Sequence, residues 1–403
     1  MTPAPVSEFG RGWTTVLAAG SGVGLGVAGL FTYNAGLFVH DLGPAIGLDR
    51  SVFGGAFFGS TLALAVAMPL VGRAVDRFGP RVTAAFGAIS LALGFLALGT
   101  VVRSPAAYVV TMVLTGLLAS ASSPVPYSRA VSGAFSRSRG LALGLTQVGI
   151  GIAAAIVPPV VSIMIGDHGW RAGFWTLAAL AAVGLLPALT LPVRDLEPAI
   201  DDGGAAFRAA RRSTLFIIQF IAFVSMALAF AGVLAHFVPM LREAGLTAQQ
   251  AGGLAGLIGV SVIVTRVIVG WLADRIQPAL LGAACCALCA AGCLALASGG
   301  AGVAAVGAIA LGTAMGAEAD LVGILTARYF GIAAYSRAYA LQYAGFMIAA
   351  GLSPVWVGAI ADRTGGYTAA LLACAALLVI PILLFLLLPG LERAAKRGRG
   401  AQA

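Results

Sequence analysis

The sequence predicts an all-α membrane protein that crosses the bilayer twelve times, in two pseudo-symmetric bundles of six helices. Two observations point to this fold class. Of 403 residues, 60% are hydrophobic and only 10% are charged, and the apolar residues form long stretches with few interruptions. Soluble domains carry about 25% charged residues, because water must solvate most of their surface. A chain with so few charges instead has a surface that suits lipid.

Each apolar stretch is long enough to cross a bilayer as a helix. The hydrocarbon core is about 30 Å thick and needs about 20 helical residues, and a helix satisfies its own backbone hydrogen bonds within lipid. The glycines of 20–29 could be mistaken for a dinucleotide-binding loop, but no strand precedes them, so we expect close helix packing there. The predicted spans are 12–36, 52–72, 82–102, 106–133, 140–165, 172–192, 214–239, 249–273, 279–298, 301–328, 338–361 and 367–389.

The basic residues predict the orientation of these spans. If the N-terminus is cytoplasmic, most arginines in the connections and the single lysine, Lys396, fall on the cytoplasmic side. The opposite side then receives only Arg50, Arg103, Arg171, Arg242 and Arg363. Cytoplasmic loops carry an excess of basic residues, so both termini are predicted to lie inside, in the cell inner membrane of a bacterium. The net charge of +9 is thus a signal of topology and does not indicate nucleic-acid binding.

A polar segment divides the chain into two halves. Residues 193–213 contain four carboxylates followed by Arg208, Arg211 and Arg212. We therefore predict an N-terminal six-helix bundle over 1–192, a cytoplasmic linker over 193–213, and a C-terminal six-helix bundle over 214–403.

The loop between the second and third spans carries a motif. Gly72-Arg-Ala-Val-Asp76-Arg77-Phe-Gly79-Pro-Arg81 resembles the G-x-x-x-D-R-x-G-R/K motif of major facilitator proteins, and Gly270-Trp-Leu-Ala-Asp274-Arg275 resembles a degenerate second copy. The resemblance implies the major facilitator fold and secondary active transport by alternating access. It also implies that Asp76, Arg77, Arg81 and Asp274 gate the cytoplasmic side, because a carboxylate there can pair with basic groups.

Two further stretches resemble the monocarboxylate transporter family. Phe135-Ser-Arg137-Ser-Arg139-Gly140-Leu-Ala-Leu-Gly144 is similar to the signature Y-F-x-K-R-x-L-A-x-G, with Ala134 in place of the tyrosine. Gly10-Arg-Gly12-Trp13 resembles the signature G-x-W-G-W more loosely. The resemblance implies a small organic carboxylate as substrate, moved with a proton or in exchange for a counter-anion.

Arg266 is the strongest candidate for a substrate contact. Val264-Thr-Arg266-Val-Ile-Val-Gly270 resembles the segment in which monocarboxylate transporters hold their substrate-binding arginine, and the guanidinium fork matches a carboxylate. A structural ion pair with Glu318 or Asp320 is the alternative. Charges at membrane depth usually serve a substrate or ion path. The aspartate that proton-coupled animal members of the family hold one turn before the arginine is Val262 here. Glu318 and Asp320 are therefore the candidates for proton coupling, and structural hydrogen-bonded carboxylates are the alternative.

Uncharged polar residues in several spans are candidates to line a cavity, although helix-to-helix hydrogen bonding would explain each one equally well. Arg129, beside the helix bend that Pro124 and Pro126 predict, is a candidate gate or a surface arginine. His236 is a candidate gate near the outer end of its span. The candidate cavity residues are Tyr33, Asn34, Gln147, Tyr339, Gln342 and Tyr343.

Other functions are weighed against transport of carboxylates. The first is efflux of drugs or hydrophobic compounds by proton antiport, which an acidic cavity would favour and Arg266 opposes. The second is a receptor or sensor that has lost transport. An enzyme has little support, because no G-x-x-x-x-G-K-S/T, H-E-x-x-H or G-x-S-x-G motif occurs. We expect no cofactor, no metal and no nucleic acid, and a monomer whose partners are a small carboxylate, a proton or counter-anion, and membrane lipid.

Overall fold

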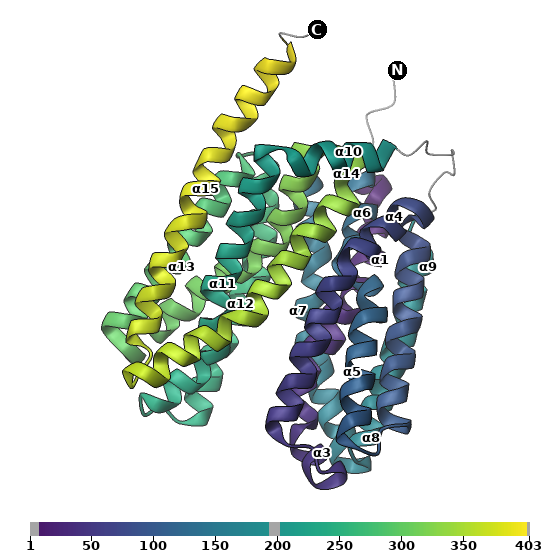
Figure 1. The fold of residues 1–403 in the computed structure, drawn as a ribbon, viewed down its shortest axis with the longest axis vertical. Helices are drawn as coiled ribbons and strands as arrows, with labels where there is room; N and C mark the ends of the chain where they lie inside the picture. The colour runs from purple at the N-terminus through teal and green to yellow at the C-terminus, as the bar shows by residue number, and fades with distance from the viewer. Residues whose placement is uncertain (1–7, 193–201, 401–403) are drawn as a thin grey trace. The chain divides into compact units, whose positions relative to one another are not determined.

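The computed structural model describes residues 8–192 and 202–400, and helices make up nearly all of this part of the chain (Figure 1). The N-terminal helices are α1 (Glu8–Gly24), η1 (Val27–Phe31), α2 (Thr32–Asn34), η2 (Ala35–Phe38), α3 (Val39–Ile46), α4 (Arg50–Thr100), α5 (Pro105–Ala119), η3 (Ser120–Ser122), α6 (Pro124–Ala134), α7 (Arg139–His168), α8 (Trp170–Val183) and α9 (Leu185–Thr190). The later helices are α10 (Asp202–Arg212), α11 (Thr214–Glu243), α12 (Ala248–Ala273), α13 (Pro278–Gly299), η4 (Gly300–Val303), α14 (Ala304–Thr364) and α15 (Thr368–Gly400).

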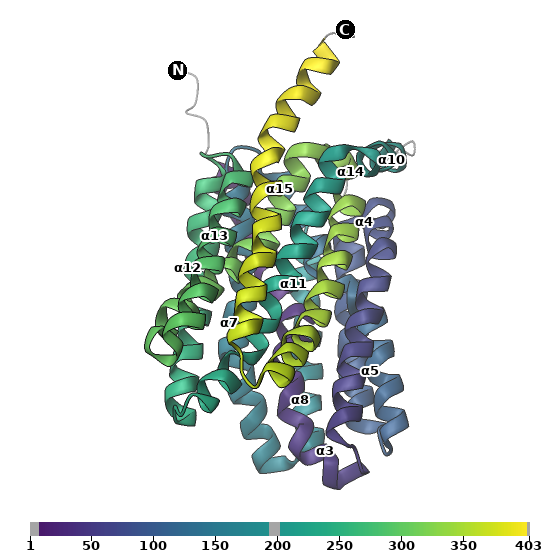
Figure 2. The same ribbon diagram turned by 60° about the vertical axis from the view of Figure 1, so that its left-hand side comes forward.

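The chain forms two compact units. The first comprises the chain up to Gly203 together with Tyr335–Ala344 of α14, and the second comprises the remainder from Gly204 onward. In the first unit α4 packs along α5 and α8, and in the second α15 packs along α11 and α13, as Figure 2 shows for the second unit. Part of the predicted linker is the helix α10, whereas residues 193–201 lie outside the described part of the chain. The predicted domain boundaries stay a prediction.

Nine helices within the described residues are long and apolar enough to cross a membrane. Two of these stretches, Val52–Thr100 and Pro278–Thr364, contain more than one predicted span. They are interrupted by glycines with positive φ: Gly79 (φ 82°), Gly300 (φ 52°) and Gly331 (φ 71°), a conformation that costs glycine little. These glycines lie in the connections that the sequence places between spans. The number of twelve spans itself stays a prediction.

Two of the predicted spans are broken in the middle. The sequence predicts one continuous helix over 12–36, but α1 ends at Gly24, and Gly26 is extended (φ −90°, ψ −171°) before the π-helical turn η1. The predicted bend near Pro124 is confirmed, because α5 passes into the 3₁₀ turn η3 and α6 begins only after Ser123 (φ −65°, ψ 170°). The two breaks meet: the backbone N–H of Val27 donates to Oγ of Ser122 at 3.1 Å. This hydroxyl gives the interrupted backbone a partner that lipid could not supply.

The glycines of 20–29 pack helix against helix, as expected. A Cβ atom added to Gly24 would lie 2.5 Å from the carbonyl oxygen of Gly149 on α7, and one added to Gly20 would lie 3.3 Å from the carbonyl oxygen of Thr146. Only a residue without a side chain allows this approach.

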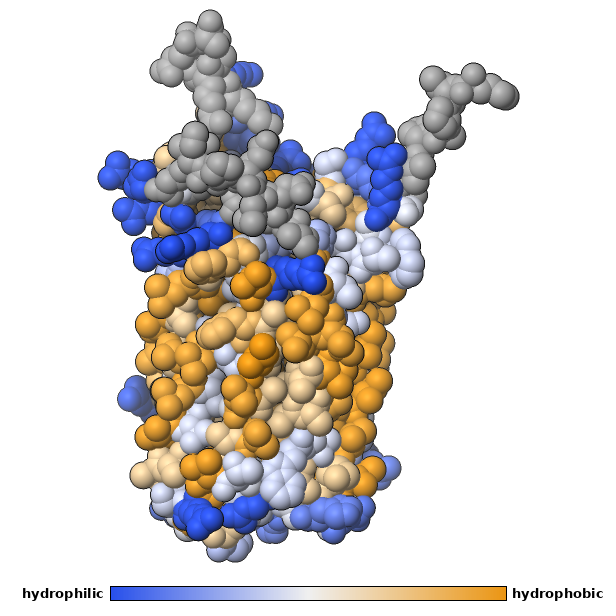
Figure 3. All heavy atoms as spheres, turned by 90° about the vertical axis from the view of Figure 1, so that its right-hand side faces the viewer, coloured by the Kyte–Doolittle hydropathy of each residue, from blue (hydrophilic) through white to orange (hydrophobic). Residues whose placement is uncertain are grey.

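The outer surface has the pattern that a bilayer requires. On the face shown in Figure 3, apolar residues cover the middle of the helices and hydrophilic residues gather towards both ends. Large apolar side chains are openly exposed along the helices, among them Val66 at 64%, Leu93 at 59% and Leu186 at 65%. Exposure of these side chains to water would be unfavourable, whereas lipid solvates them.

Candidate functional site

The second unit holds a buried ion pair. Nη1 of Arg266 on α12 donates to Oδ1 of Asp320 on α14 at 3.2 Å, and both side chains are almost completely shielded from solvent. Desolvating two charges is costly, and their attraction offsets this cost only when the geometry is good and the remaining polar atoms are satisfied. The sequence left open whether Arg266 meets Glu318 or Asp320, and the structure pairs it with Asp320.

Two glycines bring this pair together. Gly312 and Gly316 precede Asp320 on α14 at intervals of four residues, so all three lie on one helix face. A Cβ atom on Gly312 would lie 2.6 Å from the carbonyl oxygen of Ile258, and one on Gly316 would lie 2.7 Å from that of Val262, both on α12. The two backbones therefore nearly touch one and two turns away from Asp320, which places its carboxylate within reach of Arg266.

The ion pair leaves polar atoms unused. Nε of Arg266, Oδ2 of Asp320 and Oε2 of Glu318 are buried and have no hydrogen-bond partner among the described residues. Buried polar groups in folded proteins are almost always hydrogen-bonded, and exceptions call for an explanation such as a ligand. The cluster thus keeps one guanidinium donor and two carboxylate acceptors available for a bound molecule or a proton.

The first unit holds a second set of unsatisfied polar groups. Both amide atoms of Gln147 on α7 and of Gln342 on α14 are buried without a hydrogen-bond partner in the described chain, as is Oδ1 of Asn34 on α2. Nδ2 of Asn34 donates to the carbonyl oxygen of Leu30 at 2.9 Å. The structure thus places these three predicted residues inside the unit, with amide groups that a ligand could use.

Three tyrosines of α14, Tyr335, Tyr339 and Tyr343, lie next to one another in the first unit. The ring of Tyr339 lies 5.6 Å from the ring of Tyr335 and 6.0 Å from that of Tyr343, centroid to centroid. All three are buried, whereas Tyr33, the other predicted tyrosine, is 38% exposed. Tyr335 was not among the residues that the sequence singled out, although its spacing of four residues from Tyr339 is the signal that places it on the same face.

The motif between the two halves of α4 forms a close contact with α14. Nε of Arg337 donates to Oδ2 of Asp76 at 2.7 Å. A Cβ atom on Gly72 would lie 2.9 Å from the Cα atom of Arg337, so the glycine allows the charged groups to meet.

The other predicted gating residues differ in their surroundings. The guanidinium of Arg77 lies 5.2 Å from the centroid of the Phe78 ring, Arg81 and Arg129 are half-buried, and Asp274 ends α12 as its C-terminal cap.

His236 on α11 contacts both α14 and Tyr367, the residue before α15. Its Nδ1 lies 3.2 Å from the hydroxyl of Tyr367, and its Nε2 lies 3.1 Å from the carbonyl oxygen of Pro354. The Tyr367 hydroxyl can donate to or accept from the imidazole, depending on the tautomer.

Glu8 makes a contact that the sequence did not predict. Its carboxylate accepts hydrogen bonds from the backbone N–H groups of Ser136, Arg137 and Ser138, at 2.9 to 3.3 Å, and from Oγ of Ser136 at 2.8 Å. These groups directly precede α7, whose N-terminus favours a negative charge. The residues concerned are 128 to 130 positions apart in the chain, so no local pattern could reveal the contact.

Comparisons with known proteins agree with this architecture. The model of the Major Facilitator Superfamily matches residues 21–330, well over half of the chain. An MFS-type transporter of Gibberella moniliformis is 27% identical over 68% of this chain, riboflavin transporter RibJ of Trypanosoma brucei brucei is 34% identical over 34%, and monocarboxylate transporter 11 of Homo sapiens is 28% identical over 96%. The chain covers 65%, 25% and 86% of their respective lengths, so it spans less than two thirds of the first two.

Solved structures show the same fold. The human organic anion transporter MFSD10 superposes with a TM-score of 0.73 over 93% of this chain and 99% of its own, at 18% identity. The predicted all-α fold and the predicted resemblance to monocarboxylate transporters are confirmed. The chain therefore belongs to the Major Facilitator Superfamily and is a multi-pass membrane protein of a family of transporters, not of enzymes.

Proposed function

We propose that this protein is a secondary transporter that carries a small organic carboxylate by alternating access, with Arg266 as the group that binds the carboxylate. The observation that carries the proposal is the buried Arg266–Asp320 pair with an unused guanidinium donor beside it. The 28% identity to a protein named as a monocarboxylate transporter, over 96% of this chain, supports the same substrate class.

The geometry explains how Arg266 can hold a substrate. A guanidinium offers five N–H donors in a planar fork, and Asp320 accepts from one end of it, at Nη1. The unused Nε belongs to the edge of the fork that binds carboxylates in a bidentate manner. A substrate anion can displace Asp320, which replaces one buried anion by another, or it can add to the free edge beside Asp320. In either case the arginine keeps an anionic partner.

The same cluster offers a route for coupling. If substrate displaces Asp320, that carboxylate loses its positive partner inside a low-dielectric protein, and desolvation then favours the protonated form. Glu318 lies two positions away on α14, with an unused oxygen of its own. Proton symport through these carboxylates is our proposal for coupling, and exchange for a counter-anion is the alternative.

Uptake by purified protein in liposomes tests the role of Arg266. We expect Arg266→Ala and Arg266→Lys to lower uptake of a carboxylate substrate by at least about tenfold, the effect of losing 1.4 kcal/mol of binding. Arg171→Ala is the matched control, because it also removes an arginine but one that is exposed and outside the proposed site. The guanidinium of Arg171 lies 4.3 Å from the centroid of the Trp170 ring. Normal uptake by folded Arg266→Ala protein would refute the carboxylate clamp.

Thermal stabilisation identifies the substrate class independently of transport. A ligand that binds only the folded state raises apparent stability by mass action, so a panel of mono- and dicarboxylates, aromatic acids, sugars and cationic drugs can be compared. We expect stabilisation by one class of carboxylate in the wild type and none in Arg266→Ala. Stabilisation by cationic drugs alone would instead assign the protein to efflux of hydrophobic compounds.

A further inference from the structure

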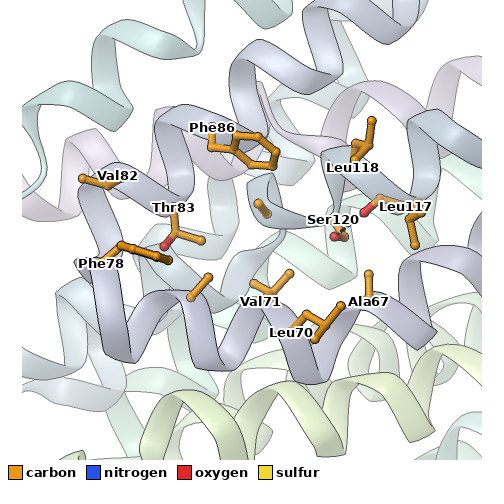
Figure 4. A pocket seen from close by; sticks show the side chains of 12 residues that line it. Ala67, Leu70, Val71, Phe78, Val82, Thr83, Phe86, Leu117, Leu118 and Ser120 are labelled. Atoms are coloured by element: carbon orange, nitrogen blue, oxygen red, sulfur yellow. Dashed lines mark hydrogen bonds between the residues drawn. The ribbon is translucent and has the colours of Figure 1, made fainter.

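A groove in the first unit lies outside the proposed transport site. Its volume is about 520 Å³, within the range of pockets that hold drug-sized ligands. Figure 4 shows that it lies between the two arms of α4, which meet near Gly79, and the end of α5 with η3. Its walls include Leu70, Ala74 and Phe78 from the first arm, Val82 and Phe86 from the second, and Leu118 from α5.

The groove offers an occupant no hydrogen bonds from side chains. Its two polar lining residues are Thr83 and Ser120. The hydroxyl of Thr83 donates to the carbonyl oxygen of Gly79 at 2.9 Å, and that of Ser120 donates to the carbonyl oxygen of Leu117 at 2.6 Å. Both donors are therefore used by carbonyl oxygens three or four residues earlier in the chain, and the surface that remains suits a hydrocarbon.

The groove opens towards lipid. Leu70 is 61% exposed and Val82 is 57% exposed, and in a multi-pass membrane protein such apolar surface faces the bilayer. The helix break at η3 shapes the inner wall: a Cβ atom on Gly87 would lie 2.1 Å from the backbone nitrogen of Ser122. The second arm of α4 therefore packs directly on the backbone of η3. Small lining residues such as Ala74 leave the groove beside this contact unfilled.

Two arginines lie next to residues that line the groove. Arg77 is exposed and its guanidinium lies 5.2 Å from the ring of Phe78, which lines the groove. Arg81 directly precedes Val82, another lining residue. Neither arginine takes part in a salt bridge in the part of the chain that the structure describes, and the neighbouring Asp76 pairs with Arg337. An apolar groove flanked by two cations is complementary to a molecule with a hydrocarbon chain and an anionic head.

We propose that this groove binds one acyl chain of an anionic phospholipid, with the lipid phosphate held by Arg77 and Arg81. Arginine pairs readily with phosphate, and each basic residue near an anionic membrane surface strengthens binding. The lipid belongs to the leaflet that faces the arginine-rich connections of the chain. Because the groove is lined by α4, α5 and η3, its occupant stiffens the contact between the helix break and the motif around Gly79.

Binding of defined lipids to the delipidated protein in detergent tests the proposal. Thermal stabilisation is measured with phosphatidylglycerol, with phosphatidylcholine of the same chains, and with water-soluble glycerol phosphate, and native mass spectrometry counts retained lipids. We expect saturable stabilisation with one retained lipid, tighter for phosphatidylglycerol than for phosphatidylcholine, and none from glycerol phosphate. Arg77→Gln should weaken the apparent affinity for phosphatidylglycerol about fivefold. It should weaken that for phosphatidylcholine by less, because the choline cation already offsets the charge of the phosphate.

Two groove variants separate a specific site from general solvation by lipid. Ala74→Phe fills the groove and should remove stabilisation by both lipids, whereas Ala92→Phe, at a half-buried alanine of α4 that does not line the groove, should retain it. Equal affinity for both lipids in the wild type, unchanged binding to Ala74→Phe, or stabilisation by glycerol phosphate alone would each overturn the proposal. If Ala74→Phe does not fold, the Arg77→Gln measurement with its lipid count decides alone.

Discussion

At the scale of single residues, Arg266 and Asp320 most constrain what the protein can bind. An arginine placed at membrane depth does not lose its proton, so it needs an anion nearby at all times. Asp320 supplies that anion at 3.2 Å. The unused Nε of Arg266 is a donor for a second anion, whereas the unused oxygens of Asp320 and Glu318 can accept only a proton or a donor group. The anionic substrate that we propose therefore depends on the arginine of the cluster and not on its two carboxylates.

We predict that the pH dependence of uptake resides in Glu318 and Asp320. If substrate moves with a proton carried by one of these carboxylates, uptake rises as the pH falls, because more of that carboxylate is protonated. We expect at least one of the variants Asp320→Asn and Glu318→Gln to flatten this pH profile, namely the one that removes the carboxylate that carries the proton. Uptake in liposomes over a range of external pH measures the effect. An unchanged profile in both variants would leave anion exchange as the coupling mode.

At the scale of secondary-structure elements, close contact between helices positions the charged groups. Gly312 and Gly316 let α14 lie directly on the backbone of α12, and Gly24 does the same for α1 on α7. Small residues at such positions are the main device for tight helix packing in lipid. The breaks at Gly26 and η3, which satisfy one another through Ser122, are typical of transporters, whose substrate sites lie beside discontinuous helices.

We predict that Gly316→Ala destabilises the protein and weakens binding of the carboxylate substrate. The added methyl group would lie 2.7 Å from the carbonyl oxygen of Val262, so α12 and α14 must move apart and Arg266 is drawn away from Asp320. Overpacking of this kind costs about 1–3 kcal/mol. Thermal unfolding and uptake in liposomes measure both effects.

Gly256→Ala is the control for this prediction. Gly256 lies in α12, and a Cβ atom there would meet nothing within 4 Å, so the higher helix propensity of alanine should leave stability equal or slightly raised. Equal stability of the two variants would mean that the contact at Gly316 is not tight.

At the scale of the whole molecule, the excess of arginine on one side predicts how the chain is inserted. Ser104 caps the N-terminus of α5, and Arg137 follows the C-terminus of α6. The stretch Pro105–Ala134 between them has 30 residues and is apolar enough to cross a bilayer, so Arg103 and Arg137 are expected on opposite sides.

We predict that a cysteine replacing Arg137 is cytoplasmic and one replacing Arg103 is extracellular. In intact cells a membrane-impermeant maleimide should label Arg103→Cys at once and Arg137→Cys only after permeabilisation. The five native cysteines are all buried, which keeps background labelling low. The reverse pattern would show that the chain is inserted the other way, with both termini outside.

The sequence by itself determined the fold class and singled out the principal charged candidates, whereas the twelve spans stay its prediction. Composition fixes a lipid-facing chain because so few charges cannot cover a surface in water, and charges such as Arg266, Glu318 and Asp320 stand out against apolar stretches. Only the tertiary structure decided which carboxylate pairs with Arg266, where the first span breaks, that Glu8 binds residues 136–138, and that α4 and η3 enclose an apolar groove. These features depend on contacts between residues far apart in the chain, and helical periodicity reveals which face a residue occupies but not which helix it meets.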